Sequence, residues 1–216
     1  MTPDPSTDAR IAGPSTPARR LILGSTSPYR RELLSRLAVP FDVVSPEVDE
    51  TPRIGEAPAQ LARRLALAKA RAVATNFPQA VVIGSDQVAD LNGLSLGKPG
   101  SHERAVVQLR QMRGQTVIFQ TAVAVVCMQS GFEEVDLAAV KVRFRKLGDD
   151  EIENYLRAEQ PYDCAGSAKS EGLGIALLES INNDDPTALV GLPLMRTCRM
   201  LRAAGITLLS RPGATP

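Results

Sequence analysis

The feature that most constrains this chain is an apolar run that leads into a Ser/Thr turn and then a proline. Residues 21–24 read LILG, and residues 25–31 read STSPYRR. Pro28 suits the first position of a helix, where its missing N–H would have had no partner. A first helical turn leaves several backbone N–H groups free and carries the positive end of the helix dipole. The sequence therefore predicts a strand, a tight turn and a helix whose N-terminus can accept an anion.

Two arginines lie in the first turn of this predicted helix. Positive charge is unfavourable there unless an anion is bound, so Arg30 and Arg31 indicate an anionic ligand. Together with the hydroxyl of Ser25 and the free N–H groups, they describe a cradle for a polyphosphate. The alternative is an ordinary capped helix with two surface arginines. The sequence has no GxxxxGK[ST] loop, which argues against a P-loop ATPase or kinase.

Composition excludes several classes of protein. The 216 residues carry a net charge of +1, which argues against a broad basic surface for nucleic acid. No apolar stretch reaches membrane-spanning length, and no export signal is visible. The three cysteines lack metal-site spacing, and a single histidine, His102, excludes a Ser-His-Asp triad. We therefore expect a cytoplasmic protein that binds neither nucleic acid nor a membrane.

The chain divides into one domain and two tails. Residues 1–19 are rich in Pro, Ser, Thr and Ala and offer little to bury, so they are predicted to be a disordered N-terminal tail. Residues 20–209 form the predicted domain, and 210–216 form a flexible C-terminal tail.

Apolar periodicity gives the order of elements inside the domain. Helices are predicted at 28–38, 57–75, 101–112, 149–157 and 193–204, and strands at 21–24, 41–44, 81–84, 116–128 and 173–178. A turn at Asn92-Gly93 has short strands on either side, and a return strand passes through 140–145. This order predicts an α/β fold with a mixed twisted sheet and flanking helices.

Polar clusters occur at the ends of these elements. Glu50 belongs to an acidic loop, Asp86 follows the strand at 81–84, and Lys98 lies in a Gly-Lys-Pro turn. The loop 165–172 reads AGSAKSEG and carries Glu171. We expect Asp86 at the C-terminal end of its strand, where open α/β sheets place ligands. Singly these groups suit solvated loops, turns or caps, but together they provide cations for phosphates and oxygens for a metal, as phosphoryl or nucleotidyl chemistry needs.

The whole pattern resembles the Maf-like nucleoside triphosphate pyrophosphatases over residues 20–209. The matching segments are 25–31, 46–53, 68–70, 83–88, 97–99, 165–172 and 190–194. Ser-Asp-Gln at 85–87 and Lys-Ser-Glu-Gly at 169–172 look like the branch that acts on 7-methyl-GTP. The resemblance implies a fold like that of inosine triphosphate pyrophosphatases, with the site in a cleft between two lobes.

The resemblance also implies a reaction and a role for each matching residue. The family cleaves between the α- and β-phosphates of a nucleoside triphosphate and uses a divalent cation, Mg²⁺ or Mn²⁺, and the resemblance suggests a homodimer. Asp86 matches the catalytic base, and Glu50 with Asp86 the metal-linked positions. The phosphate-contacting positions are Ser25, Arg30, Arg31, Lys69 and Lys98. The positions that set base specificity are Tyr29, Gln87 and Glu171.

The chemistry of a 7-methylated guanine is consistent with this interpretation. Its cationic ring is attracted to an aromatic face such as that of Tyr29. Its Watson–Crick edge offers two adjacent donors, which the carboxylate of Glu171 could accept side by side. Two alternatives stay open: the same reaction on another canonical or modified nucleotide, and a nucleotide-binding regulator of cell division.

Overall fold

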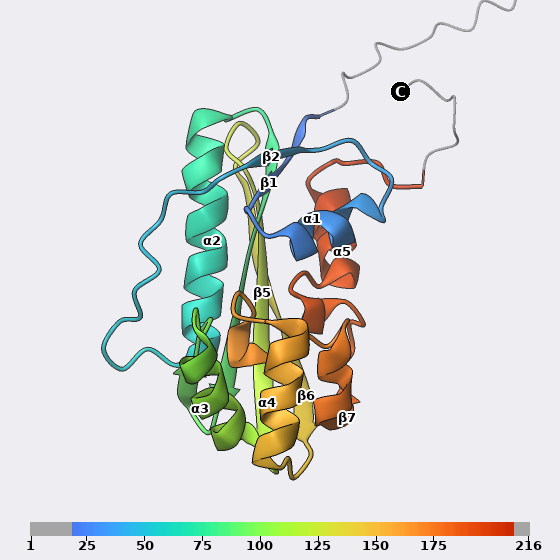
Figure 1. Cartoon of the computed structure of the whole chain (residues 1–216). Helices are drawn as coiled ribbons and strands as arrows, with labels where there is room; N and C mark the ends of the chain where they lie inside the picture. Colours follow the sequence, from blue (N-terminus) through green and yellow to red (C-terminus); the bar gives the residue numbers. More distant parts are fainter. Residues whose placement is uncertain (1–18, 210–216) are drawn as a thin grey trace, which may run out of the picture.

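The computed structural model describes residues 19–209, which form one seven-stranded sheet flanked by helices (Figure 1). The strands are β1 (Leu21–Gly24), β2 (Asp42–Val44), β3 (Val81–Leu91), β4 (Leu94–Leu96), β5 (Thr116–Cys127), β6 (Phe132–Phe144) and β7 (Leu178–Asn182). The helices are α1 (Pro28–Ser35), α2 (Pro58–Asn76), α3 (His102–Met112), α4 (Asp149–Glu159) and α5 (Leu194–Ala203), with 3-10 turns at Ala165–Ser167, Leu173–Leu177 and Ala188–Val190. The predicted tails lie outside the described residues, except for Arg19.

The sheet is mixed, which confirms the predicted fold class. Its strand order is β2-β1-β3-β5-β6-β7, and β4 pairs with β3. β1 is parallel to both β2 and β3, whereas β3, β5, β6 and β7 pair antiparallel along the chain. Asn92 and Gly93 both have positive φ angles, as a two-residue hairpin turn requires, and they join β3 to β4 as predicted.

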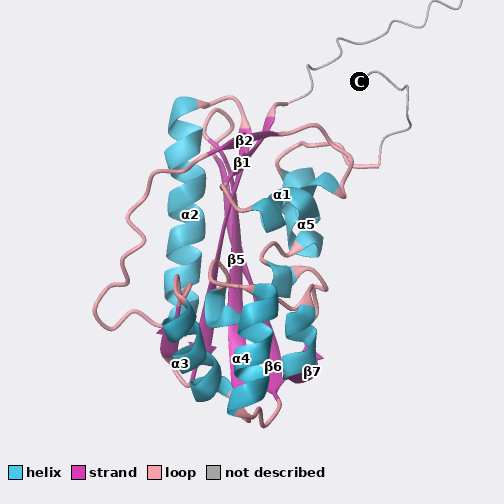
Figure 2. Ribbon diagram, viewed as in Figure 1, coloured by secondary structure: helices cyan, strands magenta, loops and turns pink. Residues whose placement is uncertain are grey.

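Alternate side chains of the central strands pack against two helical layers, one on each face of the sheet. Leu21 and Leu23 of β1 point into one core with α1 and α5, whereas Ile22 between them points into another core with α2. Figure 2 shows α2 on one side of the sheet and the α1/α5 pair on the other. The period of two in these short apolar strands therefore fixes which helix covers which face.

A third core lies at the far end of the long strands. Phe119 of β5 and Val140 of β6 pack there with residues of α3 and α4. β3 passes from one end to the other, because Val88 belongs to the α2 core and Ala89 to the α3/α4 core. The two ends are the two lobes of the domain, and they share β3, β5 and β6. Figure 1 shows the long strands β5 and β6 between them.

Two predicted strand limits were wrong. β3 continues to Leu91, so Asp86 lies in the middle of a strand and not at its end. The polar residues 85–87 hid this continuation, because they interrupt the apolar pattern. The strand predicted at 173–178 is a 3-10 turn over Leu173–Leu177, and β7 begins at Leu178. The chain turns back on itself here instead of extending, and Gly174 packs directly on the backbone of Lys169.

α2 approaches β3 unusually closely at Gly84. A Cβ atom at Gly84 would lie 2.2 Å from the carbonyl oxygen of Ala66 and 2.5 Å from the backbone nitrogen of Ala70. Real Cβ atoms do not come so close to backbone, so this position needs glycine. The contact brings Lys69 of α2 beside the strand that carries Asp86.

The close approach gives a testable prediction. Gly84→Ala should lower the free energy of unfolding by about 1–3 kcal/mol, because the added methyl group forces α2 away from β3. Urea denaturation measures the change. Gly97→Ala is the matched control, since its added Cβ would have no heavy atom within 4 Å. Equal stability of the two variants would contradict the argument.

Candidate functional site

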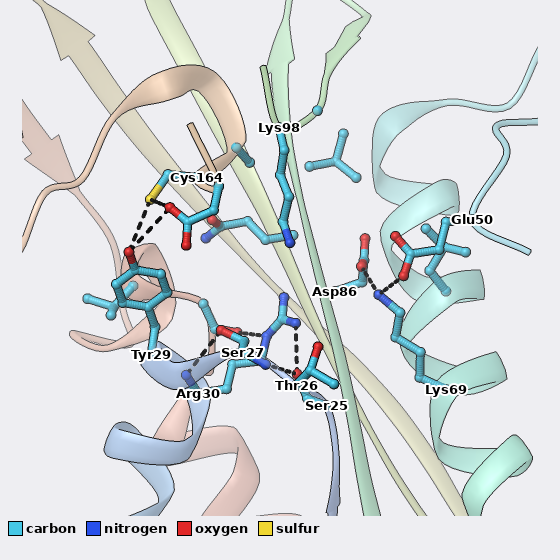
Figure 3. Close-up of a pocket in the computed structure, with 18 of the residues that line it drawn as sticks. Ser25, Thr26, Ser27, Tyr29, Arg30, Glu50, Lys69, Asp86, Lys98 and Cys164 are labelled. Atoms are coloured by element: carbon cyan, nitrogen blue, oxygen red, sulfur yellow. Dashed lines mark hydrogen bonds and ion pairs between the residues drawn. The ribbon is translucent and has the colours of Figure 1, made fainter. Parts of the chain in front are cut away.

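A cleft opens beside β3 where one neighbouring strand ends and the next begins. β1 pairs with β3 as far as Gly24 opposite Gly84, and β4 joins the same edge only from Ala89. Residues 85–88 therefore have no strand beside them on that edge. The cleft there has a volume of about 590 Å³ and lies between the two lobes, as the resemblance implied. Figure 3 shows the side chains that point into it.

A buried lysine links the two predicted metal-site carboxylates. The Nζ atom of Lys69 donates to Asp86 Oδ1 at 2.7 Å and lies 2.7 Å from Glu50 Oε1 (Figure 3). The side chains of Lys69 and Asp86 are 8% and 10% exposed, whereas that of Glu50 is 60% exposed. The second oxygen of Asp86 points away from Lys69 and has no recorded hydrogen bond to residues 19–209. One oxygen of a nearly buried carboxylate is thus fixed and the other is available.

The turn after β1 holds Arg30 in the cleft. Ser27 caps α1 by accepting a hydrogen bond from the backbone N–H of Arg30. The guanidinium donates to the carbonyl of Gly191 at 2.9 Å and to the Ser25 hydroxyl at 3.3 Å. Burial lowers the pKa of Arg30, and the negative charges of Asp86 and Glu50 oppose this shift. Arginine stays charged in proteins, so the cleft contains an oriented cation.

The two remaining residues predicted to contact phosphate, Lys98 and Arg31, lie in different places. Lys98 lies after β4 and lines the cleft from the opposite side. It is exposed, and no ion pair or hydrogen bond of its ammonium group is recorded among the described residues. Arg31 is not brought to this cleft: it is exposed and lines a shallow depression with Phe41 and Val43. Successive helical residues point about 100° apart, so the cleft receives one of the two arginines.

The three predicted base-specificity residues all line the cleft. The Tyr29 hydroxyl donates to Asp163 Oδ1 at 3.4 Å, and Cys164 Sγ lies 3.8 Å from the same hydroxyl. Glu171 is exposed, and its recorded hydrogen bond within the described chain is to the neighbouring Ser170. The carboxylate of Glu171 therefore has an open side toward the cleft.

Gln87 has a structural task as well. Its amide nitrogen donates to the Thr121 hydroxyl and to the carbonyls of Ala188 and Leu189, at 2.8–3.1 Å. These bonds fasten the 3-10 turn that precedes Gly191, whose carbonyl in turn orients Arg30. With its N–H₂ group occupied in this way, Gln87 can offer the cleft its carbonyl oxygen as an acceptor.

Sequence reasoning missed Asp163, Cys164 and the carbonyl of Gly191. Asp163 and Cys164 directly precede the loop 165–172, so their position was the one available signal. Gly191 lies in the matching segment 190–194, but the role of its carbonyl was missed, because a backbone group that orients an arginine leaves no trace in side-chain types.

The donor set for a metal is small. Among residues 19–209 no group of three or more His, Cys, Asp or Glu side chains lies close enough together to hold an ion. Glu50 and Asp86 form a pair of carboxylates at the cleft, since both contact Lys69 Nζ and both line it. Mg²⁺ is commonly held by one or two carboxylates together with substrate phosphates and water. The residues present therefore fit a cation shared with a bound polyphosphate.

Comparison with known proteins identifies the family. A family model described as Maf-like protein matches residues 20–204. The chain belongs to the Maf-like protein family. It is 75% identical over 211 residues to a 7-methyl-GTP pyrophosphatase of Polaromonas sp. strain JS666, covering 98% of this chain and 95% of the relative. The same name is carried by a relative from Albidiferax ferrireducens, 73% identical over 88% of this chain and 96% of that one.

A more distant relative extends the match. The 7-methyl-GTP pyrophosphatase of Methylobacillus flagellatus is 56% identical over 86% of this chain and 97% of the relative. The predicted family is thus confirmed. In the described part of the chain, no helix combines the length and apolar character that crossing a membrane requires.

The buried ion pair gives a second prediction. Lys69→Met should lower the free energy of unfolding by about 3 kcal/mol, because Asp86 then stays buried without its cation. Lys69→Met combined with Asp86→Asn should lose less, since the uncompensated charge is gone. Urea denaturation of both variants at neutral pH measures the difference. A double variant less stable than the single one would contradict the argument, because the buried charge of Asp86 would then carry no free-energy cost when Lys69 is absent.

Proposed function

We propose that this protein hydrolyses 7-methyl-GTP to 7-methyl-GMP and pyrophosphate. The observation that carries the proposal is a single cleft with two chemically different ends. Asp86, Lys69 and Arg30 form a charged end suited to phosphates, and Tyr29 with Glu171 forms an end suited to a base. The names of the similar proteins support the same substrate.

The phosphate end would bind and orient the triphosphate. Arg30 is fixed by the Gly191 carbonyl and Ser25, so its remaining N–H groups are oriented before substrate arrives. Lys98, opposite, would neutralise charge on the leaving pyrophosphate. Ser25 is buried and accepts hydrogen bonds from Arg30 and from the Ser27 N–H, which leaves its own proton for a phosphate oxygen.

Asp86 would act as the general base. Its unbonded oxygen can accept a proton from a water molecule as that water attacks the α-phosphorus. The bond from the α-phosphorus to the bridging oxygen then breaks, and the electron pair leaves with pyrophosphate. Lys69 fixes the other oxygen of Asp86, so the carboxylate is oriented before the reaction.

A divalent cation fits the same end. Glu50 and Asp86 would hold it together with the substrate phosphates, where it would neutralise the charge that develops on them. Because both carboxylates contact Lys69 Nζ, the lysine keeps them side by side when no cation is bound.

The base end would select a methylated guanine. Tyr29 offers an aromatic face, and base stacking on such a face contributes roughly 1–3 kcal/mol. A cationic base gains a further cation–π share. Glu171 would accept the two adjacent donors of the guanine edge, whereas uracil or thymine presents one donor beside an acceptor.

Pyrophosphate release from purified protein tests the proposal. Steady-state rates with Mg²⁺ and with Mn²⁺ should be measured on 7-methyl-GTP, GTP and the other canonical triphosphates. We expect the highest kcat/KM for 7-methyl-GTP. A higher value for another nucleotide would assign the same reaction to that substrate. Tight binding without any pyrophosphate release would instead favour a nucleotide-binding regulator.

The role of Asp86 gives a third prediction. Asp86→Asn should lower kcat by about 10²–10⁴-fold, because the amide cannot accept the proton. Asp90→Asn is the matched control: Asp90 lies on the same strand but outside the cleft, where it accepts a bond from the Gly93 N–H. More than about a tenth of the parent rate in Asp86→Asn would remove this residue from the mechanism.

The role of Glu171 gives a fourth prediction. Glu171→Gln should lower kcat/KM for 7-methyl-GTP, with a loss of transition-state stabilisation of roughly 1–3 kcal/mol, because an amide accepts one guanine donor and opposes the other. Pyrimidine triphosphates should lose less. Glu179→Gln on β7, also exposed but outside the cleft, is the control. An equal loss for every nucleotide would show that Glu171 does not read the base.

A further inference from the structure

We propose that Asp163 selects the positive charge of a 7-methylated base, while Glu171 reads its hydrogen-bonding edge. The proposal deepens the function proposed above and rests on it. It makes Asp163 a specificity-determining residue that distinguishes 7-methyl-GTP from GTP.

The position of Asp163 at the base end is the first observation. Its carboxylate accepts the hydrogen bond of the Tyr29 hydroxyl at 3.4 Å, and Cys164 Sγ lies 3.6 Å from the same oxygen. Both Asp163 and Glu171 line the cleft. Their negative charges both contribute to raising the pKa of Tyr29, after burial and the contact with Cys164.

The balance of charge at this end is the second observation. Burial raises the pKa of the Cys164 thiol to about 12, so the thiol and the Tyr29 phenol are neutral at physiological pH. Lys169 lies over this end, with its Nζ 6.0 Å from the Tyr29 ring centroid. That ammonium is paired with Glu159 at 2.6 Å. No ion pair of Asp163 or Glu171 with a cation is recorded among residues 19–209, so the base end has an excess of negative charge.

Substrate chemistry separates the two carboxylates. Guanine and 7-methylguanine present the same donors on the Watson–Crick edge, so Glu171 alone cannot distinguish them by that edge. They differ in the methyl group and in the positive charge that it places on the ring. An additional carboxylate beside the stacking ring would favour the charged base through space, without a hydrogen bond to it.

Three nucleotides and two variants test this assignment. The nucleotides are 7-methyl-GTP, GTP and 7-deaza-7-methyl-GTP, in which carbon replaces N7 so that the methyl group is present without the charge. Asp163→Asn removes the charge but can still accept the Tyr29 hydroxyl, whereas Tyr29→Phe removes that hydrogen bond and keeps the charge. Dissociation constants are measured by calorimetry in EDTA, so the result does not depend on turnover, and melting temperatures confirm folding.

We expect Asp163→Asn to weaken 7-methyl-GTP binding roughly fivefold, the size of a partly exposed ion pair. The dissociation constants of the two nucleotides with an uncharged base should change less than about twofold. The preference for 7-methyl-GTP over 7-deaza-7-methyl-GTP should persist in Tyr29→Phe. An unchanged preference in Asp163→Asn would overturn the proposal. An equal loss of preference in Tyr29→Phe would also overturn it, because Asp163 would then act by positioning the ring. If the parent protein prefers the nucleotide with the cationic base but does not hydrolyse it, the proposed function fails while the role of Asp163 stands.

Discussion

The site depends on one buried lysine. Lys69 connects Asp86 on the central strand to Glu50 on the acidic loop, and it reaches both because α2 lies directly on Gly84. Its two carboxylate partners would otherwise repel each other at the edge of the α2 core. The ion pair therefore joins the packing of a helix on a sheet to the arrangement of the chemical groups. A change in the glycine contact is a change in the geometry of the site.

The sheet supplies the other constraint, which is a gap in strand pairing. β1 stops at Gly24 and β4 begins opposite Ala89, so residues 85–88 face a cleft where other strands would face a neighbour. The N-terminus of α1 opens onto the same cleft with Ser25 and Arg30. The cleft thus has charged groups for phosphates at one end and Tyr29, Asp163 and Glu171 at the other. A nucleotide has the same division, with charge at one end and an aromatic ring at the other.

Much of this arrangement could be predicted from the sequence, and the exceptions have physical causes. The β1–α1 turn was readable because Pro28 and the Ser/Thr residues act locally. The middle position of Asp86 was not, since strand pairing continues through polar residues that face a cleft. Arg31 was indistinguishable from Arg30 in the sequence because a one-residue rotation about a helix decides which reaches the site. Asp163 contributes through its proximity to Tyr29, more than 130 residues away in the chain, which no local pattern records.

A crystal structure with a non-hydrolysable substrate analogue tests the central claim most directly. In 7-methyl-GTP with a methylene group between the α- and β-phosphorus atoms, the scissile bond is blocked while the charged groups remain. The account predicts the α-phosphate beside the unbonded oxygen of Asp86 and the methylated base stacked on Tyr29, with its edge on Glu171. A base bound at the Asp86 end, or a triphosphate that contacts neither Arg30 nor Lys98, would contradict it.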